Sequence, residues 1–158
     1  MVATAQNSHQ PQLSVRLTSD KDSYSLRGTL QLRVTRENTG SCSVAIHRRW
    51  EWGAFSRIRV FDSEGSENKD VLYATDDPPP LTSVDFIVLN PGEWFGTQLN
   101  EVVRAFVKSP GDYEFLVEYR TYLSEDLAQK YVPRREAVFW SRERAAVTSN
   151  KIKLRITE

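Results

Sequence analysis

The chain has 158 residues, equal numbers of acidic and basic side chains and one cysteine, so an intramolecular disulfide is excluded. Zero net charge argues against nucleic acid or an anionic membrane surface as the partner. No apolar run approaches the ~18 residues of a membrane-spanning helix, so we expect no membrane insertion. A single domain is the expectation for a chain of this length.

The N-terminal stretch is polar, and we expect residues 1–11 to form a flexible tail ahead of one domain over 12–158. Ala3-Thr4-Ala5 has the small-x-small form of a signal-peptidase site, although no charged or hydrophobic region precedes it. Two locations follow. The protein is periplasmic or secreted if this is a remnant cleavage site, and cytoplasmic otherwise.

Short runs of alternating apolar and polar residues predict a succession of strands separated by turn signals. The predicted strands cover 13–17, 30–35, 42–47, 55–61, 84–89, 95–99, 102–107, 113–119, 137–140 and 151–157, with a further short strand at 71–73. An insertion over 123–148 precedes the last strand. Ser124, followed by two acids, predicts a short helix there that ends before Pro133.

The strand over 113–119 is the most strongly patterned part of the chain. A Pro-Gly turn at 110–111 precedes it, and one of its faces is aromatic and β-branched. The first residue of that face, Tyr113, can tie the corner to upstream backbone through its hydroxyl. These features predict an all-β fold, an immunoglobulin-like antiparallel β-sandwich of about seven to nine strands with a short helix in the insertion. A barrel is the alternative.

Four turn signatures carry a resemblance to known families. They are Arg36-Glu37-Asn38-Thr39-Gly40, Arg59-Val60-Phe61-Asp62, Leu89-Asn90-Pro91-Gly92-Glu93 and Pro110-Gly111-Asp112-Tyr113. Together they resemble bacterial immunoglobulin-like domains, and their order is similar to that of the intracellular proteinase inhibitor family of bacilli. The resemblance covers residues 13–120 and the last strand. It implies a β-sandwich and adds protease inhibition as a candidate function, with no functional residues carried over.

The chain offers little material for catalysis. If 42–47 is one strand, Cys42 faces the core and His47 faces outward, which argues against a Cys–His dyad. None of the common catalytic, nucleotide-binding or zinc motifs is present, so we expect no enzyme, no cofactor and no metal. The acidic loop over 62–77 has oxygen ligands that suit calcium, but its spacing fits no EF-hand, so a solvated loop is the preferred interpretation.

Binding is the better-supported class of function. Tryptophan beside arginine is the composition of interface hot spots, and it occurs at 47–55 and 134–144. The residues chosen as a protein-binding site are Arg48, Trp50, Trp52, Arg135, Phe139 and Trp140. An alternative function is carbohydrate binding, in which Trp50, Trp52 and Trp94 stack on sugar rings. A purely structural explanation is that the tryptophans are buried in the core. An unpaired edge strand could also support self-association into a homo-oligomer.

Overall fold

The computed structural model describes residues 10–50, 55–71 and 80–158. The predicted binding residue Trp52, the acids Asp76 and Asp77, most of the N-terminal tail and most of the predicted strand at 71–73 lie outside the described residues. Among the described residues, no helix is long and apolar enough to cross a membrane.

Over the described residues the fold is all-β with one short α-helix, as predicted. The strands are β1 (Leu13–Ser19), β2 (Ser23–Ser25), β3 (Thr29–Asn38), β4 (Val44–His47), β5 (Ser56–Phe61), β6 (Phe86–Leu89), β7 (Trp94–Val102), β8 (Gly111–Tyr119), β9 (Val138–Phe139), β10 (Val147–Thr148) and β11 (Ile152–Thr157). The helix is α1 (Glu125–Ala128), and two single 3-10 turns cover Ser83–Asp85 and Val103–Ala105.

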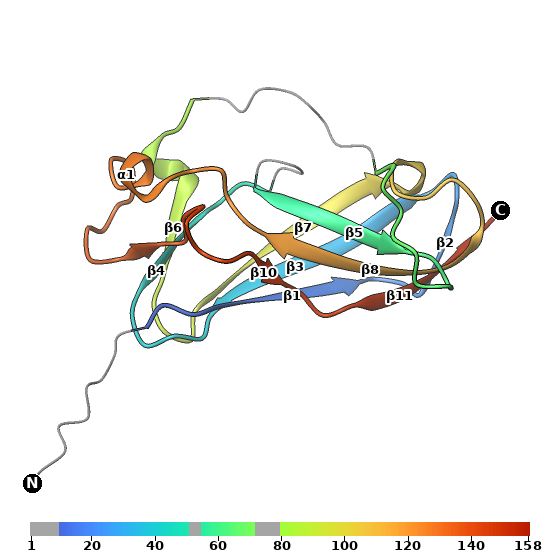
Figure 1. The fold of residues 1–158 in the computed structure, drawn as a ribbon, viewed down its shortest axis with the longest axis horizontal. Helices are drawn as coiled ribbons and strands as arrows, with labels where there is room; N and C mark the ends of the chain where they lie inside the picture. Colours follow the sequence, from blue (N-terminus) through green and yellow to red (C-terminus); the bar gives the residue numbers. More distant parts are fainter. Residues whose placement is uncertain (1–9, 51–54, 72–79) are drawn as a thin grey trace, which may run out of the picture.

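The strands form an immunoglobulin-like sandwich of two facing sheets with a third, smaller sheet at one end (Figure 1). Sheet A has the order β1-β3-β7. In sheet B, β8 pairs with β5 on one side and with β10 and β11 on the other, and β11 pairs with β2. Sheet C has the order β6-β4-β9. Most pairings are antiparallel, but β2–β11 and β4–β9 are parallel.

The main core lies between sheets A and B because both present alternate apolar side chains inward. Leu32 and Val34 on β3 are buried, as are Phe115 and Val117 on the predicted central strand β8. A second apolar cluster lies under the insertion and includes Phe55, Phe86, Leu123, Ala128 and Phe139. The insertion therefore has a small core of its own at one end of the sandwich.

Two local predictions from the sequence are confirmed. The Tyr113 hydroxyl donates to the Ser109 backbone carbonyl at 3.0 Å, which closes the corner at the start of β8. The Ser124 side chain accepts from the backbone N–H of Leu127, as expected of a helix N-cap.

Other predictions were wrong. The strand predicted at 95–99 is part of β7, which continues to Val102, whereas most of the strand predicted at 102–107 is replaced by a 3-10 turn. The residues between the two predicted strands, Asn100 and Glu101, belong to β7 and pair with Gln31 and Leu30 of β3. The three-residue strand β2, which pairs with β11, was not predicted. The two-residue strand β10 was also missed, because two residues are too few to show a period.

Candidate functional site at the insertion end

The four residues of β4 are all buried, because the strand is covered on both faces. Val44 and Ile46 point into the main core, and Ala45 belongs to the cluster under the insertion. His47 was predicted to face outward and is instead fully buried. The alternation of side chains along β4 correctly placed His47 on the face opposite Ile46. The cluster under the insertion covers that face as well, so His47 is buried.

Cys42 lies just before β4 and is half-buried, so it is not the core residue that the sequence suggested. Its backbone carbonyl accepts from the side-chain amide of Asn38, which also donates to the carbonyl of Leu89. The backbone of Cys42 is thus part of a hydrogen-bonded turn between β3 and β4.

A buried arginine fixes the end of β4. Arg36 on β3 donates to the carbonyls of His47 at 2.7 Å and Arg48 at 3.3 Å, and to the Thr97 hydroxyl at 3.2 Å. The Tyr119 hydroxyl accepts from the backbone N–H of His47 at 3.3 Å. The exposed side chain of Arg48 therefore projects from a backbone that the core holds in place.

Aromatic rings surround the Arg36 guanidinium in place of a carboxylate. Its central carbon lies 5.2 Å from the Trp50 ring centroid, 5.3 Å from that of Tyr119 and 5.4 Å from that of Phe95. Contacts of this kind stabilise a desolvated cation by about 2 kcal/mol or more. Burial nevertheless lowers the pKa of Arg36 from its usual value. Trp50, a predicted binding residue, thus serves as one wall of this cage.

His47 occupies the opposite side of β4 from Arg36. Its ring stacks on Phe55 at 3.8 Å between centroids and meets Phe86 edge-on at 5.4 Å. Its Nδ1 accepts from the backbone N–H of Arg49, so the neutral ring carries its proton on Nε2. Burial lowers the pKa of His47 to about 4, although the charge of Asp85 opposes the shift.

Asp85 completes the support of this end. Its carboxylate pairs with Arg49 at 2.9 Å and accepts from the backbone and hydroxyl of Thr82. Its backbone carbonyl accepts from the N–H of Arg48. Burial raises the pKa of Asp85, but the Thr82 hydrogen bonds and the Arg49 charge outweigh it and hold the pKa below its usual value.

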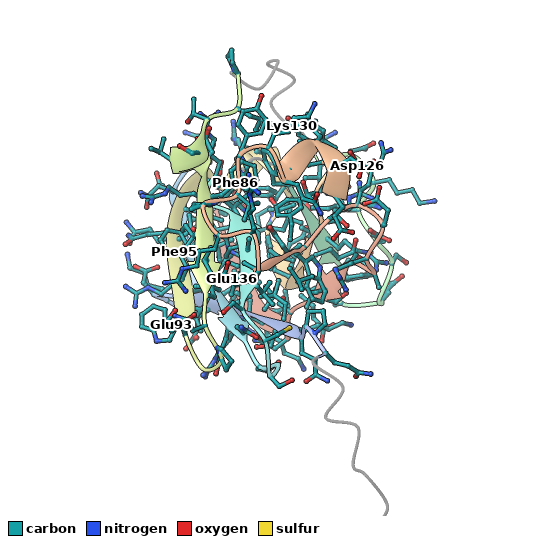
Figure 2. The ribbon with its side chains drawn as sticks, turned by 90° about the vertical axis from the view of Figure 1, so that its left-hand side faces the viewer. Phe86, Glu93, Phe95, Asp126, Lys130 and Glu136 are labelled. Carbon is teal, nitrogen blue, oxygen red and sulfur yellow. The ribbon has the colours of Figure 1, made fainter. Side chains whose placement is uncertain are left out.

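Above this frame, the insertion forms a surface hollow of about 500 Å³, which we call the insertion hollow. Its lining is Glu125, Asp126, Gln129, Lys130, Val132, Arg134, Arg135, Ala137 and Phe139. Two acids come from α1, three bases come from the turn that follows it, and the floor is apolar. Figure 2 looks at this end and shows Asp126 and Lys130 beside α1.

The bases of the insertion hollow differ in how they are held. Arg134 donates to the side-chain oxygen of Asn90 at 3.2 Å, which fixes it toward the β6–β7 turn. Lys130 and Arg135 have no ion pair or side-chain hydrogen bond with any other described residue. Arg135 is exposed. Both charges are therefore open to a ligand that enters the hollow.

The residues predicted as a protein-binding site are separated by the fold. Arg48 and Arg135 are exposed, whereas Trp50, Phe139 and Trp140 are buried. Only Arg135 and Phe139 line the insertion hollow together. These three aromatic side chains pack in the interior, so they have a structural role in the core. A binding role for the two arginines stays a prediction.

Sequence reasoning missed Lys130 and gave Arg134 no separate role. The signal available was weak, since Lys130 lies in the helical turn and Arg134 in a charge-rich run. Trp140 has a defined packing role that the sequence did not suggest, because Arg144 lies over its ring at 5.6 Å and donates to the Phe139 carbonyl.

The acidic loop holds no metal site within its described part. Asp62 accepts from the backbone N–H groups of Glu64 and Ser66, and Glu67 pairs with Arg59. Among the described residues, no group of three or more potential ligands converges. This part of the loop uses its carboxylates to stabilise its own turn and the neighbouring strand.

A comparison with protein-family models found no match, and neither did one with curated protein sequences. The similarity to the intracellular proteinase inhibitors therefore has no support from sequence comparison. Solved structures do resemble the domain. The sporulation control protein Spo0M of Bacillus subtilis matches with a TM-score of 0.50 and 10% identity, over 92% of this chain and 49% of Spo0M.

Two further structures are similar at lower scores. The CARDB domain of the PF1109 protein of Pyrococcus furiosus has a TM-score of 0.43 and 13% identity, with 94% of each chain covered. A β-glucosidase of Listeria innocua has a TM-score of 0.47 and 11% identity, and this chain spans 16% of its length. At such identities the likeness to Spo0M concerns the fold alone: the chain is a β-sandwich domain.

Proposed function

We propose that this protein is a non-catalytic binding domain that recognises another protein through the insertion hollow. The observation that carries the proposal is the pair Lys130 and Arg135, which have no ion-pair partner among the described residues and lie over an apolar floor at the end of a sandwich. Loops at such ends commonly carry function, because the sheets hold them in place.

The chemistry of the hollow suggests the kind of segment that it takes. Lys130 and Arg135 suit a carboxylate, since they offer charged donors that form no ion pair within the described part of the chain. Val132, Ala137 and Phe139 suit an apolar side chain beside it. The acids of α1 at the other wall disfavour a purely acidic segment. A peptide with an acidic residue next to an apolar one is the expected ligand.

The rigid frame beneath the hollow supports the same proposal. Phe139 is buried on β9, which pairs with β4, and Arg36 fixes the end of β4. Ala128 and Leu123 pack α1 onto the same cluster. A floor that is already packed in the free protein loses little conformational entropy when a ligand binds.

A selection from a random peptide library displayed on phage tests this proposal. We expect the wild-type domain to enrich sequences with an acidic residue beside an apolar one. Lys130→Glu/Arg135→Glu should lose that enrichment. A matched control, Lys21→Glu/Arg27→Glu, makes the same charge change at two exposed positions away from the hollow lining. Equal enrichment by all three proteins, or enrichment without acidic residues, would reject the proposal.

A further inference from the structure

The outer face of sheet A is a second candidate surface, and the proposed function does not involve it. Because Leu30, Leu32 and Val34 point into the core, the alternate residues of β3 point outward. Four cross-strand pairs with β7 build this face: Gln31–Asn100, Arg33–Gln98, Thr35–Gly96 and Glu37–Trp94. Arg16 and Thr18 on β1 extend it past the other side of β3, opposite Thr35 and Arg33.

The polar side chains of this face are not paired with one another. Within the described chain, no ion pair or side-chain hydrogen bond engages the outward groups of Arg16, Arg33, Glu37, Gln98 or Asn100. Their side chains therefore offer donors and acceptors that no described residue of the protein uses. Amide side chains both donate and accept, which is what hydroxyl groups of a ligand require.

Trp94 supplies an aromatic platform at one end of the face. Its side chain is 65% exposed, the highest value of any described aromatic residue. The neighbouring outward position on β7 is Gly96, and a Cβ there would lie 3.4 Å from the indole ring. The glycine therefore leaves the space beside the ring open. An indole is amphipathic, and tryptophan is enriched at interfaces where one side of the ring is apolar and the other is wet.

A shallow hollow of about 290 Å³ lies farther along the same face. Thr18, Ser19, Asp20, Gln31, Arg33 and Gln98 contribute to its lining, together with Leu32. Gln98 is four residues from Trp94 on β7, which corresponds to about 13 Å along an extended strand. The platform and the polar hollow thus lie in line, and an extended ligand would contact both.

The charges of the face balance. Arg16 and Arg33 are opposed by Asp20 and Glu37, and Asp20 is further engaged by the Tyr24 hydroxyl. A strongly anionic or cationic ligand would gain little from such a surface. The combination of one aromatic platform, several amides and hydroxyls and no net charge fits a neutral, hydroxyl-rich chain.

We infer that the outer face of sheet A binds a neutral polysaccharide. The apolar C–H face of one sugar ring would stack on Trp94, and the hydroxyls of the following rings would hydrogen-bond to Gln98, Arg33 and Gln31. Trp50 takes no part because it is buried in the Arg36 cage. Of the three tryptophans that the sequence suggested for sugar stacking, this site uses Trp94, and Trp52 lies outside the described residues.

Affinity electrophoresis tests the assignment with four soluble probes: dextran, laminarin, xyloglucan and galactomannan, each cast in a native gel. We expect at least one probe to retard the wild-type protein, and Trp94→Ala to weaken that binding by about tenfold or more. Trp94→Phe should keep part of it. Val84→Ala is the control, since it removes an exposed apolar side chain that lies outside sheet A.

Circular dichroism and thermal melts would first establish that each variant is folded. No retardation of the wild-type protein by any probe would overturn the inference, as would retardation that Trp94→Ala leaves unchanged. If sedimentation instead reveals self-association that Trp94→Ala abolishes, without retardation in any gel, the face is a protein interface and the polysaccharide assignment is wrong.

Discussion

The hollows at the two ends of the sandwich differ in what their charged side chains do. Figure 1 places the insertion with α1 at one end of the long axis and β2 with the C-terminus at the other. The groove at the second end, which we call the C-terminal groove, has a volume of about 860 Å³, larger than the insertion hollow. Its lining includes the acids Asp22, Asp62, Glu64, Asp112 and Glu114 with Lys153 and Arg155.

In the C-terminal groove both bases already have partners. Arg155 pairs with Asp112 at 2.8 Å, and Glu114 accepts from Lys151 at 2.8 Å and lies 4.0 Å from Lys153. The hydrogen bond from Arg155 lowers the pKa of Asp112 accordingly. In the smaller insertion hollow, Lys130 and Arg135 have no ion pair with any residue that the structure describes. The two hollows therefore differ in the charge that they offer to a ligand, and this difference, not their volume, is why we propose the insertion hollow as the binding site.

The largest expected effect comes from removing the frame under the insertion end. Arg36→Ala leaves the His47 and Arg48 carbonyls without donors and empties the aromatic cage, so the free energy of unfolding should fall by about 3–5 kcal/mol. Hydrogen exchange should quicken at β4 more than at β8. The control is Arg33→Ala, on the same strand and exposed. Equal destabilisation by both variants would contradict this account of the frame.

The next effect is a pH dependence confined to the insertion end. His47 has a folded-state pKa of about 4, so between pH 6.5 and 4 the unfolded chain binds a proton that the native protein excludes. Stability is therefore lost as pH falls through this window, by about 2 kcal/mol between pH 7.5 and 5. Urea unfolding at several pH values measures it. His47→Gln should flatten the curve in this window, and an unchanged curve would refute the assignment.

A smaller effect is expected at the other end. Tyr113→Phe removes the hydroxyl that donates to the Ser109 carbonyl beside the C-terminal groove. The free energy of unfolding should drop by about 1 kcal/mol, the usual net value of one hydrogen bond. Tyr131→Phe is the matched control, since no hydrogen bond of its hydroxyl is seen within the described chain. Thermal melts of both variants decide whether the corner contributes.

The smallest expected effect on stability tests the difference between the charged residues of the C-terminal groove and those of the insertion hollow. Arg155→Ala breaks a fully exposed ion pair with Asp112, and such pairs contribute little because water screens them. The melting temperature should stay within experimental scatter, and peptide binding at the insertion hollow should not change. A clear loss of binding in this variant would show that the C-terminal groove, and not the insertion hollow, takes the ligand.

The sequence predicted the sandwich because long strands carry a readable period. β3, β8 and β11 alternate clearly, and the Pro-Gly turn before Tyr113 marks the corner. Short strands carry too few residues for a period to be read. β4 has four residues, so its pattern could not reveal that a second layer covers His47. Two-residue strands such as β10 offer no period at all.

The candidate site was only partly predictable for a different reason. Aromatic residues beside arginine describe both an interface and a core, so Trp50 and Trp140 looked like hot spots although each packs against a neighbouring arginine inside the fold. Arg135 is exposed, and its predicted role in binding stays a prediction. Its convergence with Lys130 depends on the path of the chain after α1, and no local pattern specifies that path.

Affinity capture from a native extract of the source organism is the most direct test of the central claim. Three folded baits are compared by quantitative mass spectrometry: the wild-type domain, Lys130→Glu/Arg135→Glu, and the charge-matched control Lys21→Glu/Arg27→Glu. We expect a protein that the wild-type and control baits enrich alike and that the insertion-hollow variant loses. Equal enrichment by all three baits, or none by any, would contradict the claim that the insertion hollow recognises a protein.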